Sequence, residues 1–388
     1  MKVKPGIDNL LDNYQNLLKG KKIGLLVNHS SINSKFHNSI SLIKNSSLWH
    51  LGAIFVPEHG FYGDKEYMDD VESYYDPYLQ LPVHSLYGKY LKPTPEMLAG
   101  IDTLIFDLQD VGVRYYTYAS TLSYCMEKCA ELNKELFVLD RPNPLNGTII
   151  QGTMLEQGFE SFVGELPLPV RHGFTIGELA LFINDYKNYN TLLTVIPMNN
   201  WRRKMCWQHT HLHWIQPSPN MPDWKTTMYY PGICLFEGTN ISEGRGTTKP
   251  FEIIGAPWIN PFTFAQHVNS LDLPYITALP LYFTPKFSKY AHQQCGGIQL
   301  CVHSLKADTF IAAAKIIHYL YQTYPDYFQW RLPPYEFNET IMPFDLLIGT
   351  NKLRVAIEKE HCINDLLNEL CLPLKVFKKN KEAFHLYK

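Results

Sequence analysis

The sequence predicts an α/β protein, with a Rossmann-like, doubly wound parallel sheet followed by a second, smaller α+β domain. Four β-rich apolar runs occur in the first 150 residues, and each ends abruptly in polar residues. Continuous apolar runs are typical of strands buried on both faces, as in parallel sheets. The segments between the runs are long enough for helices, and the pattern changes near residue 155 to motif-rich loops. We therefore expect a Rossmann-like domain over residues 1–155 and an α+β domain over residues 156–388.

The predicted strands of the sheet come first in chain order, over residues 22–27, 51–56, 103–106 and 135–139. The clearest helix between them runs from Tyr118 to Leu132, with Asn133 as a plausible stop. In the second part, Thr175 and Glu178 have the spacing of a capping box and predict a helix that starts there. Further strands are expected over residues 192–198 and 297–303, and helices over 307–322 and 363–370.

Composition and charge exclude several classes of protein. The 388 residues are 45% hydrophobic and 19% charged, an ordinary balance for a globular protein with a core. With 35 Lys and Arg against 37 Asp and Glu, a nucleic-acid binder that relies on a basic surface is not expected. No apolar run is long enough to span a membrane. The N-terminal segment has no signal-peptide pattern, so we expect a cytoplasmic protein, or a periplasmic or secreted one if the chain was trimmed.

Polar residues stand directly after each predicted strand. Ligands of open parallel sheets bind beyond the carboxyl ends of the strands, so these residues are expected to converge on one crevice. The alternative is that they only cap turns and helices. No glycine-rich phosphate loop follows the first strand, so a nucleotide is not predicted. The strand-end residues are Asn28, Glu58, His59, Asp107, Gln109, Asp110, Asp140, Arg141 and Asn143.

Two segments carry groups suited to acid–base chemistry. Glu58 lies in the sequence Pro-Glu-His-Gly, where the glycine allows a sharp turn, and a carboxyl group in a crevice can act as a general acid. The Gly- and Thr-rich segment 237–248 holds Glu237, Glu243 and Arg245 and is suited to binding sugar hydroxyls or amides, although a plain turn-rich loop is the alternative. The histidines of segment 209–213 lack a supporting metal-binding pattern, and neither a metal nor a cofactor is predicted.

The order of these motifs resembles a bacterial family, the exo-β-N-acetylmuramidases (NamZ or YbbC-like). The resemblance rests on segments such as FVPEHGFYGD, FDLQDVGVRYYTY, VLDRPNPLNG, FVGELPLPVRHG and FEGTNISEGRGTTKPFE, and it covers nearly the whole chain. It implies a Rossmann-like N-terminal domain and a smaller C-terminal domain, with the site in the cleft between them. It also implies an exo-acting glycoside hydrolase that releases N-acetylmuramic acid from the non-reducing end of peptidoglycan fragments, at its β-1,4 link to N-acetylglucosamine.

The same resemblance implies roles for particular residues. Glu58 is the expected acid or acid/base, with Glu243 or Glu237 as its partner, whereas Glu165 is a poor candidate because the family motif is usually apolar there. An arginine is expected to bind the lactyl carboxylate of the substrate, with Arg245 ranked before Arg171 and Arg114. The expected substrate-binding residues are Asn28, His59, Asp107, Gln109, Asp110, Arg114, Arg171, His172, Asn220, Asn240 and Arg245.

The expected partners are therefore muropeptides and the disaccharide MurNAc-GlcNAc, with no nucleic acid and no membrane. In the cytoplasm, the substrates would be imported fragments rather than the intact wall. A non-catalytic protein that binds or senses muropeptides on the same fold is the alternative.

Overall fold

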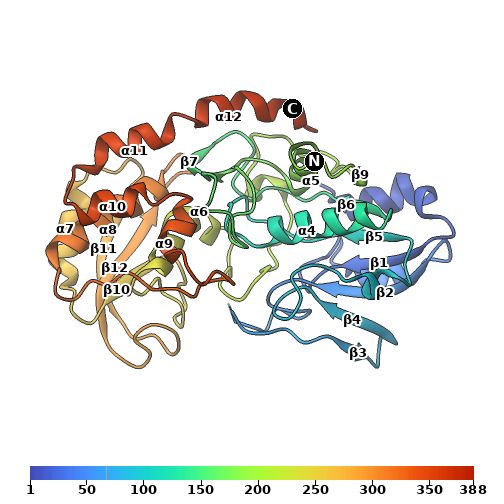
Figure 1. The fold of residues 1–388 in the computed structure, drawn as a ribbon, viewed down its shortest axis with the longest axis horizontal. Helices are drawn as coiled ribbons and strands as arrows, with labels where there is room; N and C mark the ends of the chain where they lie inside the picture. The colour runs from blue at the N-terminus through green and yellow to red at the C-terminus, as the bar shows by residue number, and fades with distance from the viewer. Residues whose placement is uncertain (67) are drawn as a thin grey trace.

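A seven-stranded, mostly parallel sheet forms one lobe of the protein, in a computed structural model that describes residues 1–66 and 68–388 (Figure 1). The strand order is β3-β4-β2-β1-β5-β6-β9, and all neighbours pair in parallel except β3 with β4. The six parallel strands thus follow the Rossmann order of third, second, first, fourth, fifth and sixth along the chain. The strands are β1 (Lys22–Leu26), β2 (His50–Val56), β3 (Tyr74–Asp76), β4 (Leu81–Ser85), β5 (Thr103–Phe106), β6 (Glu135–Leu139) and β9 (Leu192–Ile196).

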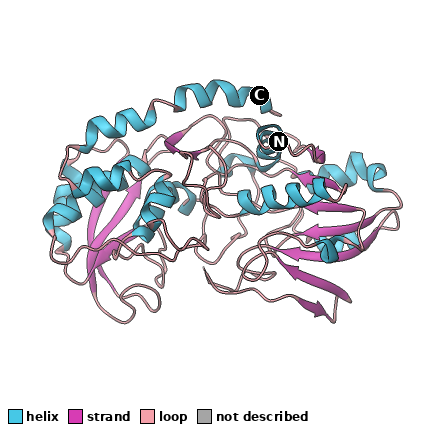
Figure 2. Ribbon diagram, in the orientation of Figure 1, coloured by secondary structure: helices cyan, strands magenta, loops and turns pink. Residues whose placement is uncertain are grey.

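Helices cover both faces of this sheet, as predicted (Figure 2). Alternate strand residues point to opposite faces, so Leu26 and Phe106 join one core while Leu25 and Ile105 join the other. This double burial is the reason for the continuous apolar runs in the sequence. One face carries α3 (Pro95–Leu98), α4 (Tyr118–Glu131) and α5 (Ile176–Tyr186), and the other carries α1 (Gly6–Asn9), the helical turns η1 (Leu10–Tyr14) and η2 (Gln15–Leu18), and α2 (Ser39–Lys44).

Local sequence sets the start of α5. The Thr175 hydroxyl accepts a hydrogen bond from the Glu178 backbone N–H at 3.2 Å, and the Glu178 carboxylate accepts one from the Thr175 N–H at 3.1 Å. These reciprocal bonds satisfy two of the N–H groups that a helix start leaves unpaired. The predicted capping box is therefore confirmed.

The second lobe is built around a smaller antiparallel sheet with the order β10-β12-β11 (Figure 1). Its strands are β10 (Ile253–Ala256), β11 (Ile276–Phe283) and β12 (Cys295–Val302). The short antiparallel pair β7 (Gln151–Met154) and β8 (Pro169–Arg171) forms a separate sheet. The remaining helices are α6 (Thr226–Ile233), α7 (Pro261–Ser270), α8 (Thr309–Thr323), α9 (Pro343–Ile348), α10 (Lys352–Glu358), α11 (Ile363–Cys371) and α12 (Leu374–Asn380), and the 3-10 turns are η3 (Trp207–Thr210), η4 (Cys234–Gly238) and η5 (Lys381–Phe384). The predicted fold class, a Rossmann-like sheet with a smaller second domain, is confirmed.

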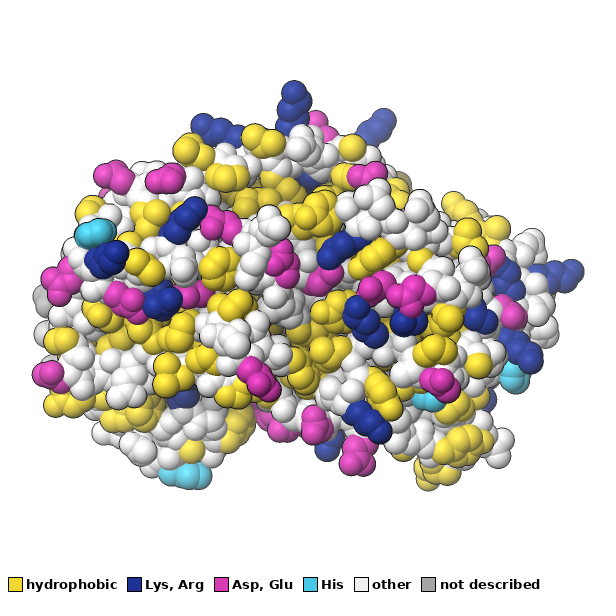
Figure 3. All heavy atoms as spheres, in the orientation of Figure 1, with side chains coloured by type: hydrophobic (Ala, Val, Ile, Leu, Met, Phe, Trp, Pro, Cys, Tyr) yellow, Lys and Arg dark blue, Asp and Glu magenta, His cyan; other side chains and the backbone are white. Residues whose placement is uncertain are grey.

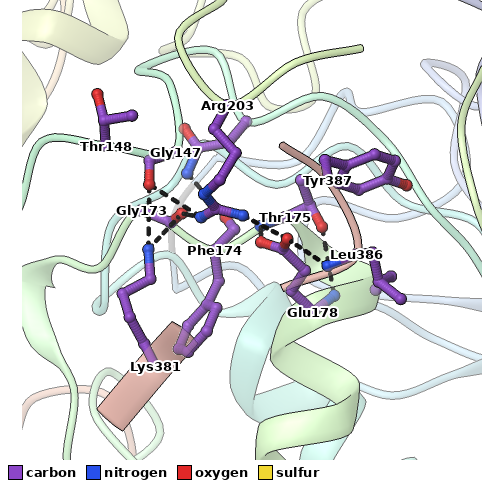
Figure 4. A network of polar contacts seen from close by, with 12 residues as sticks. Gly147, Thr148, Gly173, Phe174, Thr175, Glu178, Arg203, Lys381, Leu386 and Tyr387 are labelled. Carbon is purple, nitrogen blue, oxygen red and sulfur yellow. Dashed lines mark hydrogen bonds and ion pairs between the residues drawn. The ribbon is translucent and has the colours of Figure 1, made fainter. Parts of the chain in front are cut away.

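The last residues of the chain return to the first lobe (Figure 4). The Lys381 ammonium group donates to the carbonyls of Gly147 and Gly173 at 3.1 and 2.8 Å. The Leu386 N–H donates to a Glu178 carboxylate oxygen at 3.0 Å. Strand β9 also lies well past residue 155, so segments from both predicted domains build the first lobe.

Candidate active site

A pocket lies beyond the carboxyl end of β2 and is closed by segments of the second half of the chain. In Figure 3 the lower edge of the molecule is indented between the two lobes, and acidic side chains gather beside the indentation. The pocket is lined by Glu58, His59, Tyr115, Tyr116, Thr117, Val163, Ser218, Asn220, Met221, Tyr230, Glu237, Arg245, Phe251, Tyr335 and Glu336.

A tight turn after β2 holds Glu58 at this pocket. His59 and Gly60 adopt left-handed backbone angles, with φ of 72° and 74°, and glycine meets this demand without steric cost. Thr117, which directly precedes α4, donates its hydroxyl proton to Glu58 Oε2 at 2.7 Å. His59 Nδ1 lies 2.8 Å from the Lys65 carbonyl, and since a carbonyl only accepts, Nδ1 carries the proton. This turn thus orients both an acid and an imidazole toward the pocket.

Glu237 faces the same pocket from η4 and is held as an anion. Arg245 Nη2 donates to Glu237 Oε1 at 2.8 Å, and the Tyr335 hydroxyl donates to Oε2 at 2.7 Å. Burial raises the pKa of Glu237, but the Arg245 charge and these hydrogen bonds outweigh burial, so the net pKa lies below its ordinary value. Glu237 therefore keeps its negative charge near neutral pH.

Glu243 lies behind Arg245 and does not line the pocket. Its carboxylate accepts a hydrogen bond from Lys289 Nζ at 2.8 Å and lies 3.4 Å from Arg245 Nε. Lys289 also donates to the carbonyls of Phe236 and Ile241 at 2.8 and 2.9 Å. Glu243 thus positions Arg245 and the loop, and Glu237 is the loop acid that reaches the pocket.

The structure adds a third acid, Glu336, that we did not single out from the sequence. It is 5% exposed, and Tyr87 donates a hydrogen bond to its Oε2 at 3.1 Å. Burial and the charges of Glu58 and Glu237 raise the pKa of Glu336 well above its ordinary value. The only local signal was an acid among rings, Tyr335-Glu336-Phe337, after two prolines.

Aromatic rings form the rest of the wall. Tyr230 packs edge to face with Tyr115 and Phe251, at centroid distances of 5.4 and 4.8 Å. The Arg245 guanidinium lies over the Phe251 ring, 4.9 Å from its centroid. The packed rings form an apolar wall, and ring faces suit the apolar faces of a sugar.

The structure brings five of the predicted site residues into this pocket, and the others lie elsewhere. Those that line it are Glu58, His59, Asn220, Glu237 and Arg245, whereas Asn28, Asp107, Gln109, Asp110, Arg114, Arg171, His172, Asn240 and Glu243 do not. Asn220 also donates to Glu66 Oε2 at 2.8 Å, at the rim formed by the loop after β2.

The polar residues that follow β1 and β5 bind protein groups instead of facing the pocket. Asn28 donates to the Pro217 carbonyl at 3.0 Å and thereby holds the loop around Pro217 against the carboxyl end of β1. Asp107 accepts from Arg141 Nε at 2.6 Å and from the Ser39 hydroxyl at 2.5 Å. Gln109 donates to the carbonyls of residues 110 and 142. Most of these contacts join segments distant in sequence, so the three side chains connect loops at the carboxyl end of the sheet.

Asp110 and His172 are buried together away from the pocket. Asp110 accepts from the Gly112 N–H at 2.6 Å, and His172 Nε2 lies 3.8 Å from its carboxylate. Burial raises the pKa of Asp110 to about 7 and lowers that of His172 to about 3. His172 is therefore neutral at physiological pH, and the two residues do not form an ion pair.

Arg114 and Arg171 are engaged by backbone carbonyls. Arg114 donates to four of them, at residues 153, 168, 347 and 348, over 2.7–2.8 Å. Arg171 donates to the Leu305 carbonyl at 2.8 Å and to Gln151 Oε1 at 3.0 Å. Asn240 likewise fixes a loop, with its amide donating to the Tyr327 carbonyl at 2.8 Å. These side chains join segments distant in sequence.

Within the described part of the chain, no cluster of three or more His, Cys, Asp or Glu residues is arranged to hold a metal ion. The histidine run lies at the short turn η3 rather than in a strand, with His211 in a left-handed conformation at φ 57°. Across residues 1–66 and 68–388, no helix has the length and apolar character needed to cross a membrane.

A pocket lined by carboxyl groups and walled by aromatic rings, between a Rossmann-like sheet and a second lobe, has the groups that a sugar-cleaving enzyme, a glycoside hydrolase, needs. Comparisons with known proteins identify the family. Residues 23–225 match the N-terminal part and residues 228–387 the C-terminal part of the family described as exo-β-N-acetylmuramidase NamZ. The chain belongs to this family, and the predicted enzyme class is confirmed. The predicted boundary near residue 155 falls inside the first match.

Individual relatives agree with this assignment. The chain is 43% identical over 387 residues to the peptidoglycan β-N-acetylmuramidase NamZ of Bacillus subtilis (strain 168), covering all of this chain and 92% of that protein. Two crystal structures of DUF1343 family proteins from Bacteroides fragilis NCTC 9343 share the fold. Their TM-scores are 0.89 and 0.77, at 32% and 29% identity, and each covers 100% of this chain and 99% of its own.

Proposed function

We propose that this protein hydrolyses the β-1,4 bond between a terminal, non-reducing N-acetylmuramic acid and the next N-acetylglucosamine in peptidoglycan fragments. The observation that carries this proposal is the pairing of Glu58 and Glu237 in one small pocket of a chain from the exo-β-N-acetylmuramidase family. Most glycoside hydrolases use two carboxyl groups, one to move a proton and one to face the positive charge that develops on the sugar.

The two acids suit these roles for different reasons. Glu237 stays ionised beside Arg245 and Tyr335, so it can face the oxocarbenium-like centre without losing its charge. Glu58 accepts a hydrogen bond from the neutral Thr117 hydroxyl at 2.7 Å, and no Lys or Arg in the described part of the chain forms an ion pair with it. It is therefore assigned to proton transfer, with no cofactor needed for the reaction.

Substrate selection requires a partner for the lactyl carboxylate of N-acetylmuramic acid. Arg114 and Arg171 donate to buried carbonyls and lie outside the pocket. Among the described lining residues, Arg245 is the arginine at the pocket and is assigned this contact in addition to its ion pairs with Glu237 and Glu243, and His59 and Asn220 offer polar groups for the hydroxyl or acetamido groups. A planar guanidinium matches a carboxylate with two parallel hydrogen bonds.

The activity is tested by incubating the protein with MurNAc-GlcNAc and with longer glycan fragments. The expected product is free N-acetylmuramic acid, released one residue at a time from the non-reducing end. Release of larger internal fragments, or binding without any product, would contradict the proposal and favour an endo-acting enzyme or the muropeptide-binding alternative.

Glu58→Gln is expected to lower kcat by about 10²–10⁴-fold while leaving substrate binding largely intact, because it keeps the shape and removes the titratable proton. Steady-state kinetics and calorimetric binding check this. Glu165→Gln is the matched control, since Glu165 pairs with Lys187 outside the pocket and should leave kcat unchanged. Near-wild-type turnover by Glu58→Gln would remove Glu58 from the mechanism.

A cytoplasmic location stays a prediction, and cell fractionation tests it.

A further inference from the structure

Glu336 and Glu58 form a pair of buried acids that reach the pocket from opposite ends of the chain. Both are 5% exposed, and both line the pocket. Tyr87, which follows β4, donates its hydroxyl proton to Glu336 Oε2 at 3.1 Å and also interacts with the Glu58 carboxylate. A single phenol thus stands next to both carboxyl groups.

The nearby cations of the described chain form ion pairs with other acids and not with Glu58 or Glu336. Arg245 pairs with Glu237 and Glu243, and Lys289 pairs with Glu243. In residues 1–66 and 68–388, no Lys or Arg forms an ion pair with Glu58 or Glu336. A buried carboxyl group that has no cation as an ion-pair partner favours its protonated form, which is the form that can donate a proton.

The backbone at Glu336 supports a role in the site. Glu336 and Phe337 have φ of 45° and 63°, in the left-handed region that non-glycine residues rarely adopt. The turn is held by reciprocal backbone hydrogen bonds of 2.9 Å between Tyr335 and Asn338. Residues fixed in such conformations cluster at functional sites, because the surrounding structure must maintain them.

Four groups face Glu336 and act on its carboxyl group. They are Glu58, Glu237, Tyr87 and the more distant Arg245. Burial and the two carboxylates raise the pKa of Glu336 well above its usual range, and the Tyr87 hydrogen bond and Arg245 oppose this only in part. The protonated form of Glu336 is therefore favoured over its carboxylate.

We propose that Glu336 is the catalytic proton donor to the leaving sugar and that Glu58 accepts the proton of the attacking water, an assignment that rests on the proposed function. The Glu336 proton moves to the glycosidic oxygen as the C1–O bond breaks, and the bonding electrons leave with the N-acetylglucosamine oxygen. Water adds its hydroxyl group to C1 and gives its other proton to the Glu58 carboxylate. Transfer of that proton back to Glu336 through the Tyr87 hydroxyl restores the starting state.

The test compares two substrates that differ in their need for a proton. The N-acetylglucosamine of MurNAc-GlcNAc must be protonated to leave, whereas the 4-nitrophenolate of a chromogenic muramide leaves as a stable anion. Glu336→Gln is expected to lower kcat/KM about 10²–10⁴-fold on the disaccharide and less than about 10-fold on the nitrophenyl muramide. Glu58→Gln is expected to lower both to a similar extent.

The ratio of the two kcat/KM values is the deciding readout, because it does not depend on the fraction of folded enzyme. An unchanged ratio in Glu336→Gln overturns the proposal. The proposal would also be overturned if Glu58→Gln, rather than Glu336→Gln, lost much more activity on the disaccharide than on the nitrophenyl muramide. Glu58 would then be the proton donor. Wild-type release of N-acetylmuramic acid tests the proposed function separately, so a failure of that function is distinguishable from a failure of the Glu336 assignment.

Discussion

At the scale of single residues, Arg245 has two tasks that a kinetic experiment can separate. Its guanidinium holds Glu237 and Glu243 in place, and it also lines the pocket. Support of the loop would affect any sugar substrate equally. Recognition of the lactyl carboxylate would affect only substrates that carry that group.

Arg245→Lys is therefore expected to lower kcat/KM for a muramide about 10- to 150-fold more than for the matched glucosaminide. This range corresponds to a charge-assisted hydrogen bond of about 1.5–3 kcal/mol, which a lysine cannot make in the same planar geometry. Parallel assays of the two chromogenic substrates provide the measurement. Equal losses on both would assign Arg245 to loop support alone.

At the scale of secondary-structure elements, Arg114 connects the middle of the chain to α9. Its Nη2 donates to the carbonyls of Leu347 and Ile348 at the C-terminal end of that helix, at 2.7 and 2.8 Å. Helix C-terminal carbonyls lack intrahelical partners, and a cation there also favours the helix dipole. Helix α9 in turn packs against η4, where a Cβ on Gly238 would lie 2.6 Å from the Phe344 backbone. Arg114 thus supports the element that carries Glu237.

Arg114→Met is expected to destabilise the protein by at least about 3 kcal/mol, because it leaves several buried carbonyls without a charged donor. Urea unfolding gives the free energy of unfolding. The exposed Arg202→Met serves as the control and should lie within about 0.5 kcal/mol of the wild type. An equally small effect for Arg114→Met would refute its supporting role.

At the scale of the whole molecule, the chain end ties the two lobes together. Arg203 and Lys381 both donate to the carbonyls of Gly147 and Gly173, and Arg203 also pairs with Glu178 of α5 (Figure 4). Burial and the nearby Arg203 charge lower the pKa of Lys381 to about 7. A neutral amine still donates to both carbonyls, so the network does not need the charge.

This shift predicts how stability depends on pH. Between about pH 7 and pH 10 the unfolded chain carries a proton on Lys381 that the folded protein has lost, so this residue makes stability rise with pH in that window. The slope is at most about 1.4 kcal/mol per pH unit. Lys381→Met should remove that contribution in urea unfolding at several pH values, whereas the exposed Lys379→Met should not. Identical slopes for Lys381→Met and the wild type would contradict the prediction.

The sequence by itself determined the Rossmann-like sheet, the α5 capping box and the family, because each depends on local pattern. Apolar runs, capping spacing and long motifs are readable without knowing what lies nearby in space. It also singled out Glu58 and Glu237, since both stand in distinctive glycine-containing motifs.

Only the tertiary structure decided which acids share the pocket. The carboxylate of Glu243, six residues after Glu237, is drawn away by Lys289, a contact between segments 46 residues apart. Glu336 meets Tyr87 across 249 residues and had no motif of its own. Arg114 looked like a substrate ligand until its four carbonyl partners were placed around it. The type of a polar residue shows which groups it can bind. Whether its hydrogen bonds are already made with other protein groups depends on long-range packing, which the sequence does not show.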